Sequence, residues 1–316
     1  MKNTSRRIIV GLFSCLIITF FIGKLSDKLD SPTTESETRT EQTGTKSPSE
    51  LDKQLIKKKR KIIRTKLTNY LDSVTKDGTA SVSFYNLGDT GKKATSQRKR
   101  PDVYEEGSLE VESNAHAVQT AANTYKLFIA AFLMKQKLND NFTWDNTNTN
   151  GFYSMIVNSE NTYAEGQLNK YGMEAVNSFI KTQGWYSPVF IYGETAMTTS
   201  YSLELLLRDL AKCTGVFTNR SDSNRILKLI EKQVYRDGIP KGVRKVDQEA
   251  TVQDKVGFLG DANNDAALVT LSNGQQYILV IMTHGHGQSG FSGFPKIAKI
   301  AKKVQEIVYN TKDVNG

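Results

Sequence analysis

Three short segments of the chain carry polar side chains at spacings that could support chemistry. In residues 121–130 (AANTYKLFIA), Lys126 follows Asn123 by three positions, which places both side chains on one face if the segment is helical. A lysine amine at this spacing can take the proton of a hydroxyl at the first position and so activate that hydroxyl as a nucleophile. Asn123 has a carboxamide instead, with no proton to give up and no useful nucleophilicity. The two residues thus have the spacing of such a pair but not its hydroxyl.

The other two segments are Ser159-Glu160-Asn161 and Lys255-Val256-Gly257. In order and spacing, the three segments resemble the Ser-x-x-Lys, Ser-Asp-Asn and Lys-Thr-Gly motifs of class A β-lactamases and penicillin-binding serine hydrolases. Asn123 replaces the nucleophilic serine, Glu160 the aspartate and Val256 the threonine. The resemblance covers about residues 51–310 and implies that family's α+β fold, an antiparallel sheet with helices and an inserted all-helical lobe. Further similar stretches are residues 198–202, 238–243 and 264–269.

The resemblance also implies roles for the matched residues. Ser159 would relay protons to the leaving nitrogen, and the Asn161 amide would hydrogen-bond the substrate. Lys255 would supply charge for a substrate carboxylate, and Gly257 would let the ligand lie against the backbone. Val256 keeps the shape of threonine without its hydroxyl, so one hydrogen bond to that carboxylate should be missing. We expect the three motifs to line one groove between two lobes.

One feature of the class A enzymes is not matched. These enzymes carry a Glu-x-x-Asn loop whose glutamate activates the hydrolytic water. The corresponding segment, residues 184–198, is short and offers only Glu194, which Thr195-Ala196-Met197 follows. Even with a serine restored at position 123, we therefore expect no rapid turnover.

The hydrophobic pattern predicts the order of the elements. Apolar residues at spacings near three, four and seven indicate one long amphipathic helix over residues 51–71. A strand at 78–87 and a turn at 86–91 towards a partner strand should follow, and then a mostly helical block at 121–229. Its clearest helices are 127–138, 162–171, 173–183 and 201–212. Three strands (252–258, 266–271 and 277–283), with a hairpin turn at 272–274, and a helix at 295–309 complete the chain. The two ends should share one sheet, with the helical lobe inserted between them.

The N-terminal region has the composition of a membrane segment. Lys2, Arg6 and Arg7 precede an uncharged run at residues 8–23, which predicts a single-pass anchor with the rest of the chain outside the cytoplasm. The run is shorter than the roughly 20 residues of a comfortable span, so a cleaved signal peptide or a lipoprotein signal at Cys15 stays an alternative. We expect an anchor or signal at 1–25, a disordered stalk at 26–50 and the folded domain at 51–316, with its helical lobe at about 120–230.

Charge and residue content limit the partners. The net charge of +9 favours polyanionic surroundings but does not choose among them. The run Lys57-Lys58-Lys59-Arg60-Lys61 is either a solvated helix face or a contact for anionic lipid or wall polymer. We expect no nucleic-acid partner. Cys15 and Cys213 form no disulfide framework, and His284 and His286 lack the neighbours that would complete a metal site, so we expect no metal and no other cofactor.

Two alternatives concern the replaced serine itself. Asn is among the best N-cap residues, so Asn123 could cap a helix over residues 124–136. Thr124 could be proposed as a substitute nucleophile, but it lies about 100° around the helix from the position that Lys126 serves.

Three functions stay open. The first is a non-hydrolytic relative that binds a carboxylate-bearing ligand, such as a cell-wall peptide, a β-lactam-like molecule or a protein partner. The second is a serine-hydrolase-type enzyme with weak or altered activity towards β-lactams or peptidoglycan peptides. The third is a membrane scaffold with a vestigial groove.

Overall fold

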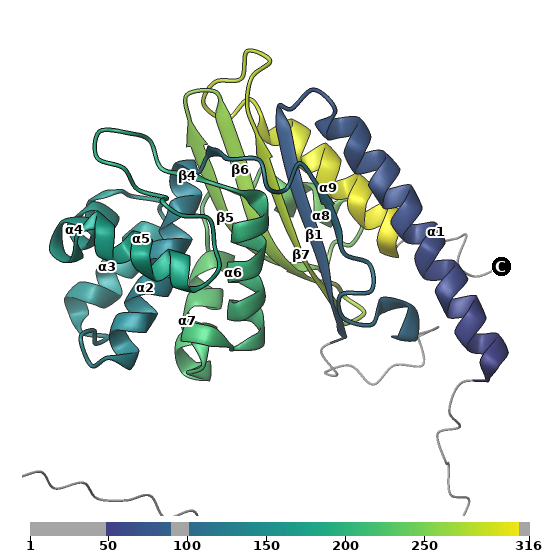
Figure 1. Cartoon of the computed structure of the whole chain (residues 1–316), viewed down its shortest axis with the longest axis horizontal. Helices are drawn as coiled ribbons and strands as arrows, with labels where there is room; N and C mark the ends of the chain where they lie inside the picture. The colour runs from purple at the N-terminus through teal and green to yellow at the C-terminus, as the bar shows by residue number, and fades with distance from the viewer. Residues whose placement is uncertain (1–48, 90–100, 310–316) are drawn as a thin grey trace, which may run out of the picture. The chain divides into compact units, whose positions relative to one another are not determined.

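A five-stranded antiparallel sheet is the centre of the computed structural model, which describes residues 49–89 and 101–309 (Figure 1). Its strand order is β2-β1-β7-β6-β5, so strands from both ends of the folded region share one sheet, as predicted. The bounds are β1 (Ala80–Asp89), β2 (Val111–Ser113), β5 (Thr251–Leu259), β6 (Ala262–Thr270) and β7 (Gln275–Thr283). A separate two-stranded sheet pairs β3 (Gln119–Thr120) with β4 (Met197–Thr198).

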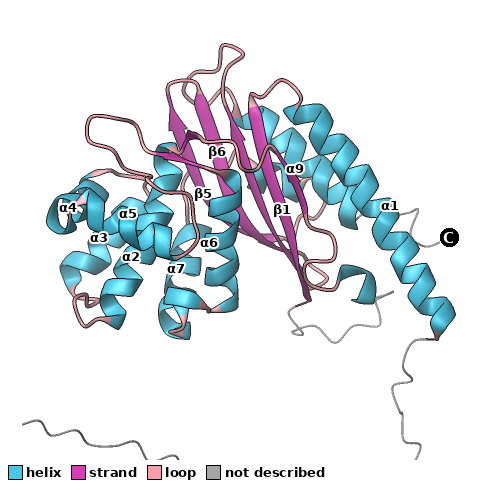
Figure 2. Ribbon diagram, viewed as in Figure 1, coloured by secondary structure: helices cyan, strands magenta, loops and turns pink. Residues whose placement is uncertain are grey.

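Helices cover both faces of the large sheet (Figure 2). One face packs against α1 (Glu50–Thr75), α8 (Ile239–Arg244) and α9 (Phe294–Tyr309). The other face packs against the helical lobe, which consists of α2 (Lys126–Leu138), α3 (Asn146–Ile156), α4 (Thr162–Tyr171), α5 (Met173–Thr182), α6 (Ser200–Lys212) and α7 (Arg220–Glu231). The short 3₁₀ helices are η1 (Pro101–Tyr104), η2 (Ala122–Tyr125) and η3 (Gly215–Phe217).

Side-chain alternation along the strands divides the core into two clusters. On β6, Ala266 and Leu268 belong to the cluster with the helical lobe, whereas Ala267 and Val269 belong to the cluster with α1, α8 and α9. Successive residues of a strand point to opposite faces, so a sheet covered on both sides needs such continuous apolar strands. The predicted hairpin turn at 272–274 joins β6 to β7, and Gly274 supplies its positive φ of 89°.

The long first helix is confirmed, and its start has a local cause. Ser49 caps α1 by accepting a hydrogen bond from the Asp52 amide at 3.2 Å, and the Asp52 carboxylate accepts from the Ser49 amide in return. Along α1, the side chains of Ile63, Leu67 and Leu71 are buried at a spacing of four residues, so one face of the helix packs against the sheet.

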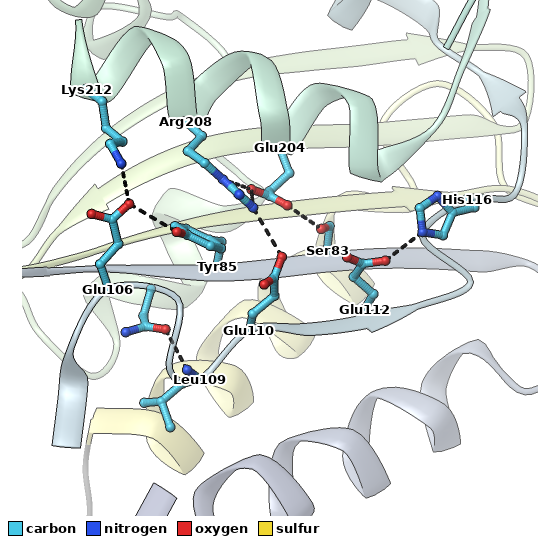
Figure 3. Close-up of polar contacts among 11 residues, drawn as sticks. Ser83, Tyr85, Glu106, Leu109, Glu110, Glu112, His116, Glu204, Arg208 and Lys212 are labelled. Atoms are coloured by element: carbon cyan, nitrogen blue, oxygen red, sulfur yellow. Dashed lines mark hydrogen bonds and ion pairs between the residues drawn. The ribbon is translucent and has the colours of Figure 1, made fainter. Parts of the chain in front are cut away.

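A buried ion-pair network ties α6 to β1 and to the segment before β2 (Figure 3). Glu204 is fully buried, accepts a hydrogen bond from Ser83 Oγ at 3.2 Å and pairs with Arg208 at 2.6 Å. The Arg208 guanidinium lies 3.5 Å from the centroid of the Tyr85 ring and also reaches Glu110 at 3.2 Å. Since burial disfavours the ionised form, the pKa of Glu204 is raised to about 7.

One predicted local structure is wrong. Residues 86–89 continue β1 rather than forming a turn, because a bulge between Asn86 and Gly88 lets the strand keep its pairing with β7. The strand predicted at 277–283 is confirmed as β7, and the chain after Thr283 turns with a positive φ of 52° at His286.

The predicted anchor and nearly all of the predicted stalk lie outside the described residues. Within residues 49–89 and 101–309, none of the helices combines the length and the apolar character needed to cross a bilayer.

Candidate functional site

The segment that carries Asn123 is positioned by an irregular turn and by close packing. Ala122 has a positive φ of 45°, an uncommon conformation for a residue with a Cβ atom, and it leads into η2. Lys126 then opens α2. Gly257 of β5 allows this approach, because a Cβ atom there would lie 2.9 Å from the backbone nitrogen of Asn123. On the next strand, Asn264 Nδ2 donates to the carbonyls at positions 120 and 121 at 2.7 and 3.0 Å.

Lys126 lies at the centre of the site, and its ammonium group is fully used. Its side chain is buried, and Nζ donates to Asn123 Oδ1 at 3.1 Å, to the Ser159 carbonyl at 2.5 Å and to Asn161 Oδ1 at 2.7 Å. An ammonium group has three N–H donors, so these three acceptors satisfy it. The structure thus brings together the first two of the predicted motifs.

Lys255 joins the third motif to the second. Its Nζ donates to Ser159 Oγ at 2.7 Å and to the Val256 carbonyl at 3.0 Å. A third acceptor is the Gln233 side-chain oxygen at 2.8 Å, in the amide orientation that also lets Gln233 donate to the Val157 carbonyl at 2.7 Å. Lys255 is fully buried, and Ser159 adopts a positive φ of 63° that presents its carbonyl to one lysine and its hydroxyl to the other.

These contacts decide which atoms face outwards. Because Lys126 holds the amide oxygens of Asn123 and Asn161, both amides have their Nδ2 groups left as donors. Ser159 Oγ accepts from Lys255 and keeps its own hydrogen to donate. Asn161 is exposed and Asn123 is half-buried, so a ligand at this edge would meet N–H and O–H groups. Such an edge suits a carboxylate, which only accepts hydrogen bonds.

Burial also changes the proton affinity of both lysines. Loss of hydration lowers the pKa of Lys126 to about 8, against the smaller opposing effects of the Glu165 and Glu160 carboxylates. The pKa of Lys255 is lowered well below its ordinary value, first by burial and second by the charge of Lys126. Neither lysine side chain is exposed, so a ligand would meet only the groups that the two ammonium groups orient.

Val256 does not join the other motif residues. Its side chain lies in the apolar cluster with α1, α8 and α9, on the opposite face of β5 from Lys255. It therefore contributes packing, and the expected ligand contact through its side chain is wrong. Gly257 accommodates η2 rather than a ligand, because the atoms within 3 Å of an added Cβ belong to residues 121–124.

Two of the alternatives considered for this segment are excluded. Asn123 does not cap α2, because the helix begins at Lys126 and the Asn123 amide oxygen accepts from the lysine side chain. Thr124 is fully buried, and its hydroxyl donates to the Ala121 carbonyl at 2.6 Å, so it cannot act as a nucleophile on a ligand.

Glu194 does not join the site. The side chain of Glu194 is exposed, and none of the described side chains forms an ion pair or hydrogen bond with it. Gln233 is a site residue that sequence reasoning missed. It lies 22 positions before Lys255 and belongs to no motif, so nothing in its local pattern indicates its role.

The described ranges also contain no group of three or more His, Cys, Asp or Glu side chains placed to hold a metal ion. Within those ranges, His286 lies 2.7 Å from the Asp77 carboxylate at the molecular surface.

Comparisons with known proteins agree with this arrangement. A model of the beta-lactamase enzyme family matches residues 151–311, half of the chain. A class A beta-lactamase from Bacteroides cellulosilyticus DSM 14838 superposes with a TM-score of 0.61 at 16% identity, covering 79% of this chain and 99% of that one. PBP-A gives 0.60 at 18% identity, covering 78% and 95%, and TLA-1 extended-spectrum beta-lactamase gives 0.60 at 16%, covering 78% and 99%. No curated protein sequence matches. With the site geometry and the family match in agreement, the chain belongs to the beta-lactamase enzyme family.

Proposed function

We propose that the protein is a non-hydrolytic member of this family that binds a carboxylate-bearing cell-wall ligand at the edge between β5 and the helical lobe. The observation that carries the proposal is the Lys126–Asn123 contact of 3.1 Å. It supports the proposal because Lys126 contacts a carboxamide oxygen here, whereas the family motif pairs this lysine with a hydroxyl. It also leaves the amide nitrogen available to donate to a ligand.

The geometry suits binding for a second reason. Asn123, Ser159 and Asn161 all present donors, and their acceptor atoms are held by two lysines. Rigid, prearranged donors bind an anion with little loss of side-chain freedom. A stem peptide of the cell wall ends in a carboxylate, and β-lactams also carry one. One of the similar structures is a mutant of PBP-A in an acyl-enzyme complex with penicillin G.

A second candidate function rests on a different contact. Ser159 Oγ lies 2.7 Å from Lys255 Nζ, and the lowered pKa of Lys255 favours the neutral amine that a general base must be. Ser159 could then replace the missing nucleophile and retain a slow enzymatic activity. The buried position of Ser159, only 8% exposed, disfavours this second function.

One labelling experiment separates the two candidates. The purified full chain is incubated with a fluorescent penicillin, and the product is analysed by intact and peptide mass spectrometry. Binding without chemistry predicts no adduct, with Ser159→Ala equally unlabelled. An adduct mapped to Ser159, and lost in Ser159→Ala, would replace the binding proposal with the enzymatic one.

Binding itself is tested with a synthetic stem peptide that ends in a free carboxylate. We expect it to bind, and the same peptide with a C-terminal amide to bind at least about tenfold more weakly, since a charged acceptor is lost. Asn161→Asp should abolish the difference in affinity between the two peptides, because it replaces the amide donor with a carboxylate that repels the peptide's own carboxylate. Asn139→Asp, at the other end of α2, is the matched control. Equal affinity for the two peptides would contradict a carboxylate site.

We also propose that the protein is held at the cell membrane by residues 8–23, with its folded domain outside the cytoplasm. The support is the sequence pattern of Lys2, Arg6 and Arg7 before that uncharged run. Protease added to intact spheroplasts should digest the folded domain while the N-terminus stays in the membrane fraction. Recovery of a secreted, processed chain from the medium would favour the signal peptide.

A further inference from the structure

Two exposed carboxylates border the candidate site, and the protein does not neutralise them. Glu160 lies between Ser159 and Asn161, and Glu165 follows Asn161 by four residues, on α4 of the helical lobe (Figure 1). Among the described residues, no cation pairs with either carboxylate. The one side-chain contact of Glu160 is a hydrogen bond from Asn158 Nδ2 at 3.3 Å, and the Glu165 carboxylate has no described partner. Both charges therefore stay open to a ligand.

Glu165 lies on the side of α4 that faces the site. Its amide donates to the Asn161 carbonyl at 2.9 Å, so one helical turn separates the two residues and their side chains share a face. Asn161 Oδ1 in turn accepts from Lys126 at 2.7 Å. The Glu165 charge also reaches the start of α2. Burial lowers the pKa of Lys126 to about 8 and raises the pKa of Tyr125 to about 12, and the Glu165 carboxylate opposes the first shift and adds to the second.

A purely anionic ligand fits this arrangement badly. Asn123, Ser159 and Asn161 offer hydrogen atoms to a carboxylate, and Ser159 is only 8% exposed, with no described acceptor for its hydroxyl hydrogen. The two lysine ammonium groups are buried and donate to protein acceptors. The exposed charges of Glu160 and Glu165 would repel an anion, because like charges close together oppose binding. A ligand that also carries an ammonium group would turn this repulsion into attraction.

We propose that the ligand is a zwitterionic peptide, with a free ammonium group in addition to its carboxylate, and that Glu165 binds the ammonium group. The ligand carboxylate accepts from Asn123, Ser159 and Asn161, and the ammonium group lies towards α4. Side chains one turn apart on a helix have Cβ atoms about 6 Å apart, so the two charged groups of the ligand are separated by a distance of that order. A lysine-type side chain spans it. The inference rests on the proposed function and narrows its ligand to one chemical class.

The test uses four versions of a synthetic stem peptide that contains one lysine. The C-terminal group is a free carboxylate or an amide, and the lysine amine is free or acetylated, which removes its charge. Affinities for the full chain are measured by titration calorimetry at low salt. Among the carboxylate peptides, we expect the free amine to bind about threefold to fivefold more tightly than the acetylated amine, the contribution of an exposed ion pair. High salt should reduce this difference, because it screens exposed charges.

Two variants assign the effect to Glu165. Glu165→Gln keeps the shape of the side chain without its charge and should remove the preference for the free amine. Glu165→Lys should reverse the preference, so that the acetylated peptide binds more tightly. Glu174→Gln, at another exposed glutamate of the helical lobe, is the matched control and should keep the preference of the parent. Each comparison is between two peptides on one variant, so a partly unfolded variant weakens both affinities equally.

Failure of this inference and failure of the proposed function give different results. A preference for the carboxylate peptides without any preference for the free amine would overturn the zwitterion and leave the carboxylate site standing. Equal affinity for the carboxylate and amide peptides, or no binding of any of the four, would contradict the proposed function and this inference with it. An amine preference that persists in both Glu165→Gln and Glu165→Lys would show that Glu165 does not bind the ammonium group.

Discussion

Lys126 Nζ lies 3.1 Å from Asn123 Oδ1, so the amine that would activate a nucleophile is hydrogen-bonded to a group that cannot react. The same amine also contacts the Ser159 carbonyl and Asn161 Oδ1. The pKa of Lys126 is lowered to about 8, which brings the neutral amine within reach near neutral pH.

Asn123→Ser should therefore restore acylation without efficient turnover. The new hydroxyl would lie beside Lys126, whereas Glu194, the one glutamate of residues 184–198, has an exposed side chain that does not reach the site. Intact mass spectrometry after addition of a penicillin should show one adduct per chain, and nitrocefin turnover should stay below about 0.1 s⁻¹, two orders of magnitude under a median enzyme. Asn123→Ala is the control and should form no adduct. Fast nitrocefin hydrolysis by the serine variant would show that another residue supplies the base.

Gly257→Ala should destabilise the fold by about 1–3 kcal/mol. The added methyl group would lie 2.9 Å from backbone atoms of η2, which cannot move away as a flexible side chain can. Urea unfolding measures the change. Gly166→Ala is the matched control, because a Cβ atom there meets nothing within 4 Å, and in α4 the alanine should be neutral or stabilising. Equal stability of the two variants would argue against the close packing of η2 on β5.

Gln233→Met should cost about 1–3 kcal/mol of unfolding free energy, because the buried Lys255 ammonium would lose one of its three acceptors. Gln233→Glu keeps an acceptor and adds an opposite charge, so it should be less destabilising at neutral pH. Chemical denaturation of both variants provides the comparison. If the methionine variant were as stable as the parent, Gln233 would not be an acceptor for the Lys255 ammonium group.

Glu204 should make the stability of the protein depend on pH. Its pKa is raised to about 7 in the folded state, chiefly by burial, so between its ordinary value and 7 the folded state binds more protons than the unfolded state. Its contribution to stability is then present at low pH and is lost as the pH rises through 7, by up to about 3 kcal/mol.

Glu204→Gln removes this titration. The difference in unfolding free energy between the parent and the variant, measured from pH 5 to pH 8, should favour the parent at low pH and decline as the pH rises. Glu105→Gln, at an exposed ion pair, should show little such slope. If the parent's advantage in unfolding free energy grew with pH instead, the ion pair with Arg208 would lower the pKa of Glu204 by more than burial raises it.

Local sequence determined much of the fold. The periodicity of residues 51–71 predicted α1 because its buried residues repeat every four positions, and residues 162–171 predicted α4 with the bounds that it has. Helix starts and bulges were less predictable. The cap of α1 lies at Ser49, and the bulge near Gly88 depends on pairing with β7, which is remote in sequence.

The sequence by itself determined the three motifs, their order and the absence of an attacking hydroxyl at Asn123, because these are properties of residue type and spacing. Only the tertiary structure decided what the motif residues do. In the folded protein, the Val256 side chain points into the core, Gly257 packs against η2 and Gln233 contacts Lys255. The physical reason is that a lysine's hydrogen-bond partners and the face of a strand that is buried depend on contacts between distant segments. No local pattern records those contacts.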